Sequence, residues 1–267
     1  MIVVFAGPSL SAEQLDRYSG IAFRPPVKQG DLYCAALEGP RAIAIIDGVF
    51  DGVPSVWHKE ILWALSRGIP VLGAASMGAL RAAELDVFGM TGIGHIYEAY
   101  RDGVLEDDDE VALQHGPAEA GYTPLSLAMV NIRATLERAV GEGRLSRDQG
   151  QRAADLIKAI HFKARDWNAV VSAVSKIPDA FAQGLGAWLR DNYVDQKNRD
   201  AIALLEHLND AEFQLDRPVG FHFEHTELWR RGVSEWRQRP QAAGAMRDNA
   251  FRLVPQERLF RSAGDDD

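Results

Sequence analysis

Short apolar runs alternate with longer amphipathic segments through the first third of the chain. Unbroken apolar runs of this kind are typical of strands buried on both faces of a parallel sheet. The strand candidates are residues 2–6, 21–23, 42–46 and 70–75. The helix candidates are residues 11–16, 31–37, 56–66 (with Ser55 as its cap) and 77–85. This alternation predicts an α/β fold with a parallel, doubly wound sheet of the Rossmann or flavodoxin type.

The pattern changes after this region. Residues 89–122 are rich in glycine and acidic residues, with little periodicity, which predicts a lid-like insertion with a short helix near residues 97–100. From Pro124 onward, apolar residues recur at helical spacing. Helices are expected from Leu125 to Val140 and over residues 146–160, 166–175, 179–191, 196–208 and 225–237. We therefore expect an α/β core domain over residues 1–122, which includes the acidic loop, and a helical region over residues 123–267.

The predicted topology places a site at one edge of the sheet. Ligands of doubly wound sheets bind beyond the carboxyl ends of the strands. Three short turns fall at such ends: Gly7-Pro8-Ser9, Asp47-Gly48 and Ala74-Ala75-Ser76. We expect Gly7, Ser9, Asp47 and Ser76 to lie around one pocket.

Ser76 is the candidate nucleophile. Ala74-Ala75-Ser76-Met77-Gly78 joins a predicted strand to a predicted helix and has the small-x-Ser-x-Gly form of a nucleophile elbow, whose tight turn requires small residues. The backbone N–H groups of a helix that starts at Met77 would face negative charge that develops near Ser76. Two alternatives stay open: Ser76 only caps the helix, or the helix N-terminus binds a phosphate group.

His58 is the candidate base. It lies in the first turn of a predicted helix, where the positive end of the helix dipole favours a neutral imidazole that can accept a proton. Asp47 or Lys59 would orient it. The alternatives are a surface histidine without a role and an aspartate that only forms a turn.

Other charged groups have both functional and structural interpretations. Arg81 and Glu84 are spaced i, i+3 on the helix after Ser76, and they either bind substrate or form an intrahelical ion pair. The acidic run at residues 106–110 could bind Mg²⁺ or a basic partner, but a solvated loop is favoured.

Composition narrows the function classes. The formal net charge is -9, so the basic footprint of a nucleic-acid-binding protein is missing. The single cysteine, Cys34, cannot form an intrachain disulfide, and no apolar run reaches the length of a membrane span. Gly89, Gly92 and Gly94 have the wrong spacing for dinucleotide binding and do not link a predicted strand to a helix. These features predict a cytoplasmic protein without a cofactor or metal, and without nucleic-acid or membrane partners.

Three segments resemble the TfuA-like proteins. They are Asp47-Gly48-Val49-Phe50, the stretch from Val56 to Leu62 that contains HKEIL, and the stretch from Gly73 to Leu85 that contains SMGALRAAEL. Residues 97–115 are also similar to that family, and Asp195-Gln196-Lys197 is similar only loosely. The resemblance implies a partner of a YcaO-type enzyme in the thioamidation of a peptide backbone. It also implies a sulfur donor such as a sulfur-carrier protein with a C-terminal thiocarboxylate, and a precursor peptide that is contacted only indirectly.

Two functions from different classes follow. In the first, the protein is a hydrolase or acyl-transfer enzyme that acts on the thiocarboxylate, with Ser76, His58, Asp47 and Lys59 as catalytic residues. Gly7, Ser9, Met77, Arg81 and Glu84 would then bind the substrate. In the second, the protein is a recruiting module without catalysis, and Lys59, Arg81 and the acidic loop are docking residues. Cys34 lies outside the motifs, so it is expected to be dispensable.

Overall fold

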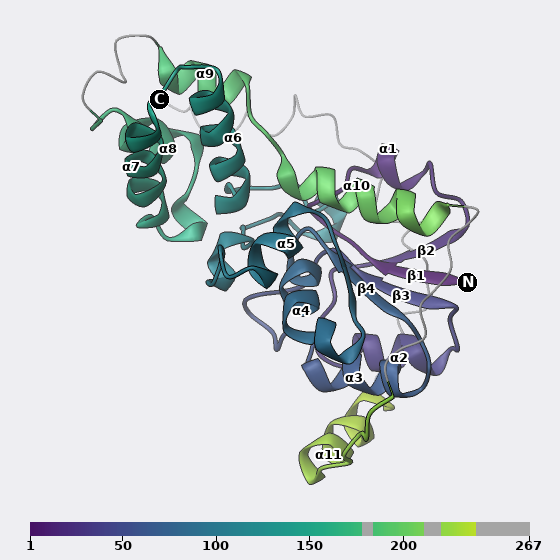
Figure 1. Cartoon of the computed structure of the whole chain (residues 1–267). Coiled ribbons are helices and arrows are strands. Elements are labelled where there is room, and N and C mark those ends of the chain that lie inside the picture. Colours follow the sequence, from purple (N-terminus) through teal and green to yellow (C-terminus); the bar gives the residue numbers. More distant parts are fainter. Residues whose placement is uncertain (178–183, 211–219, 239–267) are drawn as a thin grey trace, which may run out of the picture.

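A computed structural model describes residues 1–177, 184–210 and 220–238. The described residues form a five-stranded sheet in which all strands are parallel, in the order β2-β1-β3-β4-β5 (Figure 1). The strands are β1 (Ile2–Phe5), β2 (Ile21–Arg24), β3 (Ala42–Ile45), β4 (Val71–Ala74) and β5 (Thr91–Ile93). This strand order is that of flavodoxin-like folds, and it confirms the predicted α/β class.

Helices cover both faces of the sheet. One core lies between the sheet and the helices α2 (Asp31–Leu37), α3 (His58–Ser66) and α4 (Met77–Leu85). The other core lies between the opposite face and two helices that are far apart in sequence, α1 (Ala12–Leu15) and α10 (Gln196–Asn209). Both cores contain alternate residues of the same strands, such as Val3 and Val4 of β1, because successive side chains of a strand point to opposite faces.

The fifth strand corrects the interpretation of residues 89–122 as an insertion. Residues 91–93 pair with β4, and Gly94, at φ 96°, leads directly into α5 (His95–Arg101). Glycines therefore do link a strand to a helix here. Gly92 is needed because a Cβ atom on it would lie 2.1 Å from the Tyr97 ring.

The helical region packs around a core of its own. That core joins the helices α6 (Met129–Gly141), α7 (Arg147–Lys158), α8 (Trp167–Val174) and α9 (Leu185–Asp191). Figure 1 shows these four helices gathered on one side, from which the chain returns along the sheet as α10. The predicted helix over residues 179–191 lies partly outside the described residues, and the C-terminal tail lies wholly outside them.

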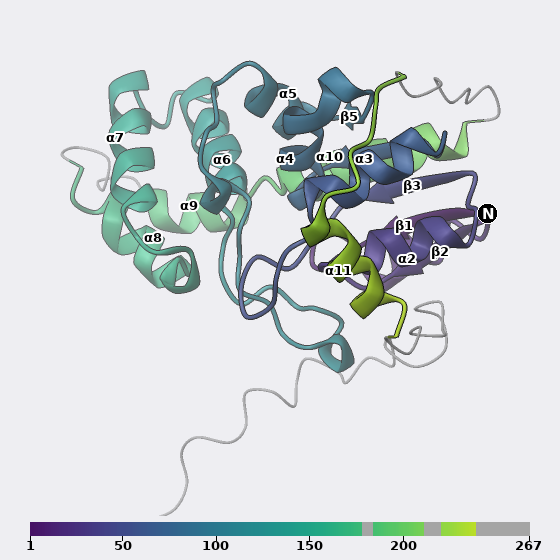
Figure 2. The ribbon, with the colours of Figure 1, turned by 90° about the horizontal axis from the view of Figure 1, so that it is seen from below.

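The last described helix, α11 (Glu227–Trp236), lies outside the α2–α3 layer (Figure 2). Trp229 and Trp236 are buried with Tyr33 of α2, and the ring centroids of Tyr33 and Trp236 are 5.7 Å apart. Gly30, at φ 91°, lets the Trp236 ring approach, since a Cβ atom there would lie 2.7 Å from it. None of the described helices is long and apolar enough to cross a membrane.

Short 3₁₀ turns complete the described elements. They are η1 (Asp86–Phe88), η2 (Asp108–Glu110), η3 (Ala118–Ala120) and η4 (Phe162–Ala164). The residue that follows η2 and two residues of η4 lie beside the carboxyl ends of β3 and β4, where they line the cavity described next.

Candidate functional site

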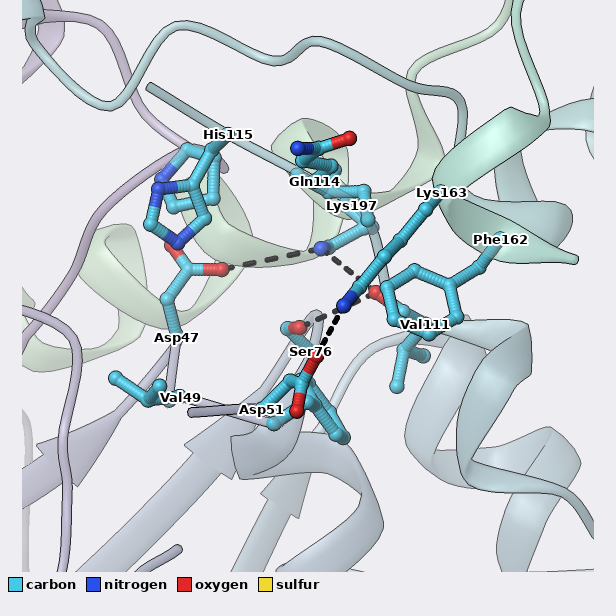
Figure 3. Close-up of a pocket in the computed structure, with 14 residues that line it drawn as sticks. Asp47, Val49, Asp51, Ser76, Val111, Gln114, His115, Phe162, Lys163 and Lys197 are labelled. Atoms are coloured by element: carbon cyan, nitrogen blue, oxygen red, sulfur yellow. Dashed lines mark hydrogen bonds and ion pairs between the residues drawn. The ribbon is translucent and has the colours of Figure 1, made fainter. Parts of the chain in front are cut away.

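A cavity of about 250 Å³ lies at the carboxyl ends of β1, β3 and β4. Its walls come from four parts of the chain: the strand ends, residues 111–115, residues 162–163 and the start of α10 (Figure 3). Asp47 and Ser76 both line the cavity, and the Ser9 hydroxyl is hydrogen-bonded to Asp47. The three strand ends therefore meet at one site, at the β1–β3 switch point where a fold of this strand order binds ligands.

Asp47 organises the floor of the cavity. Its Oδ2 accepts hydrogen bonds from the backbone N–H groups of Gly7, at 2.8 Å, and Ser9, at 3.0 Å. Its Oδ1 accepts the Ser9 hydroxyl at 2.7 Å. Asp47 is 1% exposed, and three donors to one buried carboxylate fix its orientation. Gly7 and Ser9 therefore contribute to the site through their hydrogen bonds to Asp47.

The turn that carries Ser76 depends on close approach of backbones. Ala75 has φ 66°, a left-handed conformation that is uncommon for residues other than glycine. A Cβ atom on Gly78 would lie 1.8 Å from the carbonyl oxygen of Ile45, and one on Gly73 would lie 2.1 Å from that of Gly78. The N-terminus of α4 therefore rests directly on β3 and β4, as the small-x-Ser-x-Gly pattern predicts.

The Ser76 hydroxyl faces the carbonyl oxygen of Val111. The two oxygens are 3.5 Å apart, which makes this a long hydrogen bond. Ser76 precedes α4, but its side chain accepts no hydrogen bond from a backbone N–H of that helix, so it does not cap α4. Met77, the first residue of α4, has a backbone N–H that its own helix cannot pair. Its side chain is buried against Gly48.

Lys197 is the main residue of the cavity that our sequence analysis did not select. It is 2% exposed, and its Nζ donates to the same Val111 oxygen at 3.0 Å and lies 3.9 Å from Asp47 Oδ1. The signal was present in the sequence, because Lys197 lies on the apolar stripe of α10. The other members of that stripe are Ala201, Leu204 and Leu208. A lysine in such a stripe is unusual in a water-soluble helix.

The mouth of the cavity carries an ion pair that the sequence also did not indicate. Lys163, next to Phe162 in η4, reaches across to Asp51 in the segment after β3 (Figure 3). Both side chains are about half exposed or more, at 46% and 61%. The pair joins the helical region to the β3–α3 connection.

His58, Arg81 and Glu84 form a separate cluster outside the residues that line the cavity. His58 Nε2 is 2.7 Å from Glu84 Oε2, and Arg81 binds the same oxygen at 2.7 Å. Burial would raise the pKa of Glu84, but hydrogen bonds and charge from His58 and Arg81 lower it overall. His58 is thus paired with Glu84, and its side chain is 48% exposed.

Lys59 and the start of α3 support α11 and α2. Lys59 Nζ donates to the carbonyl oxygen of Glu224 at 2.6 Å and to Thr226, the cap of α11, at 3.1 Å. The predicted cap Ser55 instead donates to the Val49 carbonyl. Glu60 takes the capping role by accepting the backbone N–H of Trp57.

The acidic run at residues 106–110 is largely neutralised within the protein. Arg133 binds Glu110 through two hydrogen bonds of 2.9 and 2.8 Å. The buried Arg165 pairs with Asp109 at 3.1 Å. Lys158 contacts Asp107, Asp109 and Glu110. The run thus attaches η2 to the helical region, and the described residues contain no group of three or more His, Cys, Asp or Glu side chains that could hold a metal ion.

No curated protein matches the chain. Residues 47–166 match a family model described as TfuA-like protein, a stretch that includes Asp47 and Ser76 but neither Ser9 nor Lys197. The chain therefore carries a TfuA-like region over residues 47–166, which confirms the family resemblance expected from its motifs.

Proposed function

We propose that this protein supplies sulfur to a YcaO-type enzyme for the thioamidation of a peptide backbone, by cleaving the thiocarboxylate of a sulfur-carrier protein. The match of residues 47–166 to the TfuA-like family supports the proposed role beside a YcaO-type enzyme. The observation that carries the chemistry is the placement of Ser76: its hydroxyl lines a cavity at the start of a helix, on a tight strand-to-helix turn. That arrangement suits acyl transfer.

The electrostatics of the cavity favour an anionic substrate end. A thiocarboxylate is negatively charged, the positive end of the α4 dipole faces its expected position, and the Lys197 amine, which also lines the cavity, can donate a hydrogen bond there. The carboxylate of Asp47 already accepts three hydrogen bonds from within the protein. A cavity of about 250 Å³ accommodates the end of a chain and not a folded domain, so the carrier would insert its C-terminus.

The reaction proceeds in two stages. Ser76 Oγ attacks the thiocarboxylate carbon, the C–S bond breaks, and sulfide leaves as HS⁻ with the proton that Ser76 gave up. The carrier is then held as an ester of Ser76. Water hydrolyses that ester, which yields the carrier carboxylate and a proton and restores the serine hydroxyl. The Met77 N–H is the candidate donor to the oxyanion in both stages.

Single-turnover release of sulfide from a thiocarboxylated carrier, without the YcaO enzyme, tests this function. The wild-type protein is expected to release sulfide, and Ser76→Ala is expected to lower the rate by about 100-fold or more. Circular dichroism controls for folding. Release by Ser76→Ala near the wild-type rate would contradict the assignment of the nucleophile.

A recruiting module is the second candidate, favoured by the cluster of His58, Arg81 and Glu84, in which the side chains of His58 and Glu84 are exposed. These residues come from the family motifs, yet they lie outside the cavity lining, where a partner protein could contact them. On this hypothesis, the wild-type protein releases no sulfide alone, and His58→Ala weakens binding to the YcaO enzyme. Affinity measured by calorimetry, alongside sulfide release, separates the two functions.

A further inference from the structure

A short antiparallel pair of chain segments lies beside the cavity. Residues 114–116 run antiparallel to residues 123–125, and hydrogen bonds of 2.7 and 2.9 Å between the two segments flank His115. A residue between two such bonds belongs to a non-hydrogen-bonded pair, so the backbone N–H and C=O of His115 point away from residues 123–125. Within the part of the chain that the structure describes, neither group makes a hydrogen bond. We call this side of the segment the His115 edge.

The His115 edge extends to Leu113. Successive residues of an extended chain present their backbone groups to opposite sides, so Leu113 and His115 share one side and Gln114 has the other. The Gln114 carbonyl accordingly accepts from the backbone N–H groups of residues 125 and 126. The N–H and C=O of Leu113 form no hydrogen bond with any residue that the structure describes. The edge therefore offers two donors and two acceptors.

Contacts within the protein hold this edge in place. Ser126 Oγ accepts the backbone N–H of Gln114 at 2.8 Å. The His115 ring packs against Tyr122, with ring centroids 5.5 Å apart, and its Nδ1 lies 2.7 Å from the carbonyl oxygen of Gly116. The imidazole thus has its own contacts within residues 114–125. A ligand that binds to an edge already fixed in this way loses less free energy to ordering.

The segment that carries the edge leads away from Ser76. Val111, Leu113 and His115 all line the cavity. The carbonyl oxygen of Val111 is 3.5 Å from Ser76 Oγ, whereas His115 lies further from Ser76 (Figure 3). A chain that places its C-terminal end at Ser76 and follows this segment outward therefore runs antiparallel to residues 111–115.

The occupant that fits this edge is the extended C-terminal segment of a protein. A free strand edge pairs readily with another chain, and folded proteins usually block or cover such edges. A cavity of about 250 Å³ admits a chain end, and the N-terminus of α4 favours an anionic group there. Pairing through the backbone is independent of side-chain identity, so it selects for an extended conformation and not for a sequence motif.

We propose that the C-terminal segment of the substrate protein binds as an added antiparallel β-strand along the His115 edge, with its anionic end at Ser76. Alternate residues of that segment exchange N–H···O=C bonds with Leu113 and His115, and the residues between them face the other way. The placement of the chain end rests on the role of Ser76 proposed above. The substrate class is then any protein whose C-terminus is flexible enough to extend along the edge.

A scan of backbone esters tests the strand pairing on the peptide side. The probe is a hexapeptide of alternating serine and alanine with an N-terminal fluorescein and a free C-terminal carboxylate, and fluorescence anisotropy with the full chain measures its affinity. Each ester replaces one peptide N–H by oxygen. Esters at alternate positions are expected to weaken binding by about fivefold, and those between them are expected to have little effect. Failure of the all-amide peptide to bind at millimolar concentration, or ester effects that do not alternate, would overturn the proposal.

A proline variant tests the pairing on the protein side. His115→Pro removes the edge N–H, which has no partner within the described residues, and proline is tolerated on a free strand edge. It is expected to weaken binding of the all-amide peptide by about fivefold. Arg147→Pro is the matched control, because it removes an N–H at the first position of α7, where proline is favoured, and it is expected to bind as the wild type does. Circular dichroism checks the fold, and wild-type affinity in folded His115→Pro would overturn the proposal.

Hydrogen exchange locates the bound peptide in the wild-type protein. Amide exchange at residues 113 and 115, read by nuclear magnetic resonance, is expected to slow when the peptide is added. Unchanged exchange at both residues with the peptide bound would overturn the proposal.

The strand pairing and the proposed function can fail separately. If the ester effects alternate but a thiocarboxylated carrier releases no sulfide, the His115 edge is supported and the proposed function is wrong. If the carrier is cleaved at equal rates by the wild type and His115→Pro, the function is supported and the strand pairing is wrong.

Discussion

The Ser9 hydroxyl donates to Asp47 across the junction of β1 and β3, with Oγ 2.7 Å from Oδ1. The backbone N–H of Ser9 binds the other oxygen of the same carboxylate. This contact joins the ends of β1 and β3, the two strands between which the strand order reverses, so the geometry of the cavity floor depends on it.

Replacement of Asp47 by Ala is expected to destabilise the protein by about 2–3 kcal/mol, because the backbone N–H groups of Gly7 and Ser9 and the Ser9 hydroxyl then lose their common acceptor. Ser9→Ala removes only one of the three bonds to Asp47, and its cost is expected to be about 1 kcal/mol. Urea unfolding of both variants measures the difference. Equal costs would show that the hydroxyl, and not the backbone donors, dominates the interaction.

Gly78→Ala is expected to destabilise the protein by about 3 kcal/mol or more, since the new Cβ atom would overlap a backbone oxygen of β3 that cannot move freely. Gly141, at the end of α6, has no atom within 4 Å of a Cβ built on it. Gly141→Ala is the matched control and is expected to be neutral or to stabilise by up to about 1 kcal/mol. Thermal unfolding of the two variants checks the contrast.

Asp109→Asn is expected to cost about 3 kcal/mol, because it weakens the ion pairing of Arg165, which is fully buried. Asp107 lies in the same acidic run, but its side chain is 68% exposed and contacts only Lys158 among the ion pairs of the described residues. Asp107→Asn should therefore cost under about 1 kcal/mol. If urea unfolding gives similar values for both, the network does not depend on burial.

Glu60 predicts a specific dependence of stability on pH. Burial raises its pKa from 4.5 to about 7, although the backbone N–H groups of Gly30, Trp57 and Tyr33 donate to it. Between these values the folded protein holds a proton that the unfolded chain releases, so this group's contribution to stability is full below pH 4.5 and is lost as pH rises through 7. The loss is about 3 kcal/mol at most.

The comparison of wild type with Glu60→Gln isolates this contribution from the other carboxylates. The amide does not titrate, so the destabilisation caused by the substitution should be larger at pH 5 than at pH 8. Urea unfolding at the two pH values measures it. A difference that grows with pH would show that the folded protein prefers the carboxylate form of Glu60.

Cys34→Ala is expected to leave sulfide release unchanged. Cys34 lies on α2 beside the aromatic cluster, with Sγ 3.8 Å from the Trp236 carbonyl oxygen, and it is not among the residues that line the cavity. The lost contact should cost at most about 1 kcal/mol. Loss of release by a folded variant, together with a persulfide at Cys34 detected by mass spectrometry, would contradict this prediction.

The strands β1 to β4 and their helices could be predicted because each is a short apolar run bounded by turn residues. Strand β5 could not, since Thr91-Gly-Ile is three residues long, partly exposed and rich in glycine. Its assignment to the sheet comes from tertiary pairing with β4.

The site was predictable only in part, for a related reason. Ser9, Asp47 and Ser76 follow predicted strands, so topology alone brings them together. Lys197 comes from a helix more than 100 residues further along, and nothing local in the sequence shows where α10 docks. The position of His58 in the first turn of α3 was foreseen, but its pairing with Glu84 depends on how two helices pack.

The cavity is expected to form late in folding, because it requires α10 to pack back onto the sheet. Asn198 donates to the carbonyl oxygen of Ser9 at 2.8 Å and to Gln14 at 2.9 Å, contacts that span 189 and 184 residues of chain. Contacts of such sequence separation form slowly, because a long loop must close first. A ribosome-bound chain that ends before residue 196 would leave the apolar sheet face of Ile2 and Val4 without its cover. The complete cavity can therefore form only in molecules whose synthesis has passed α10.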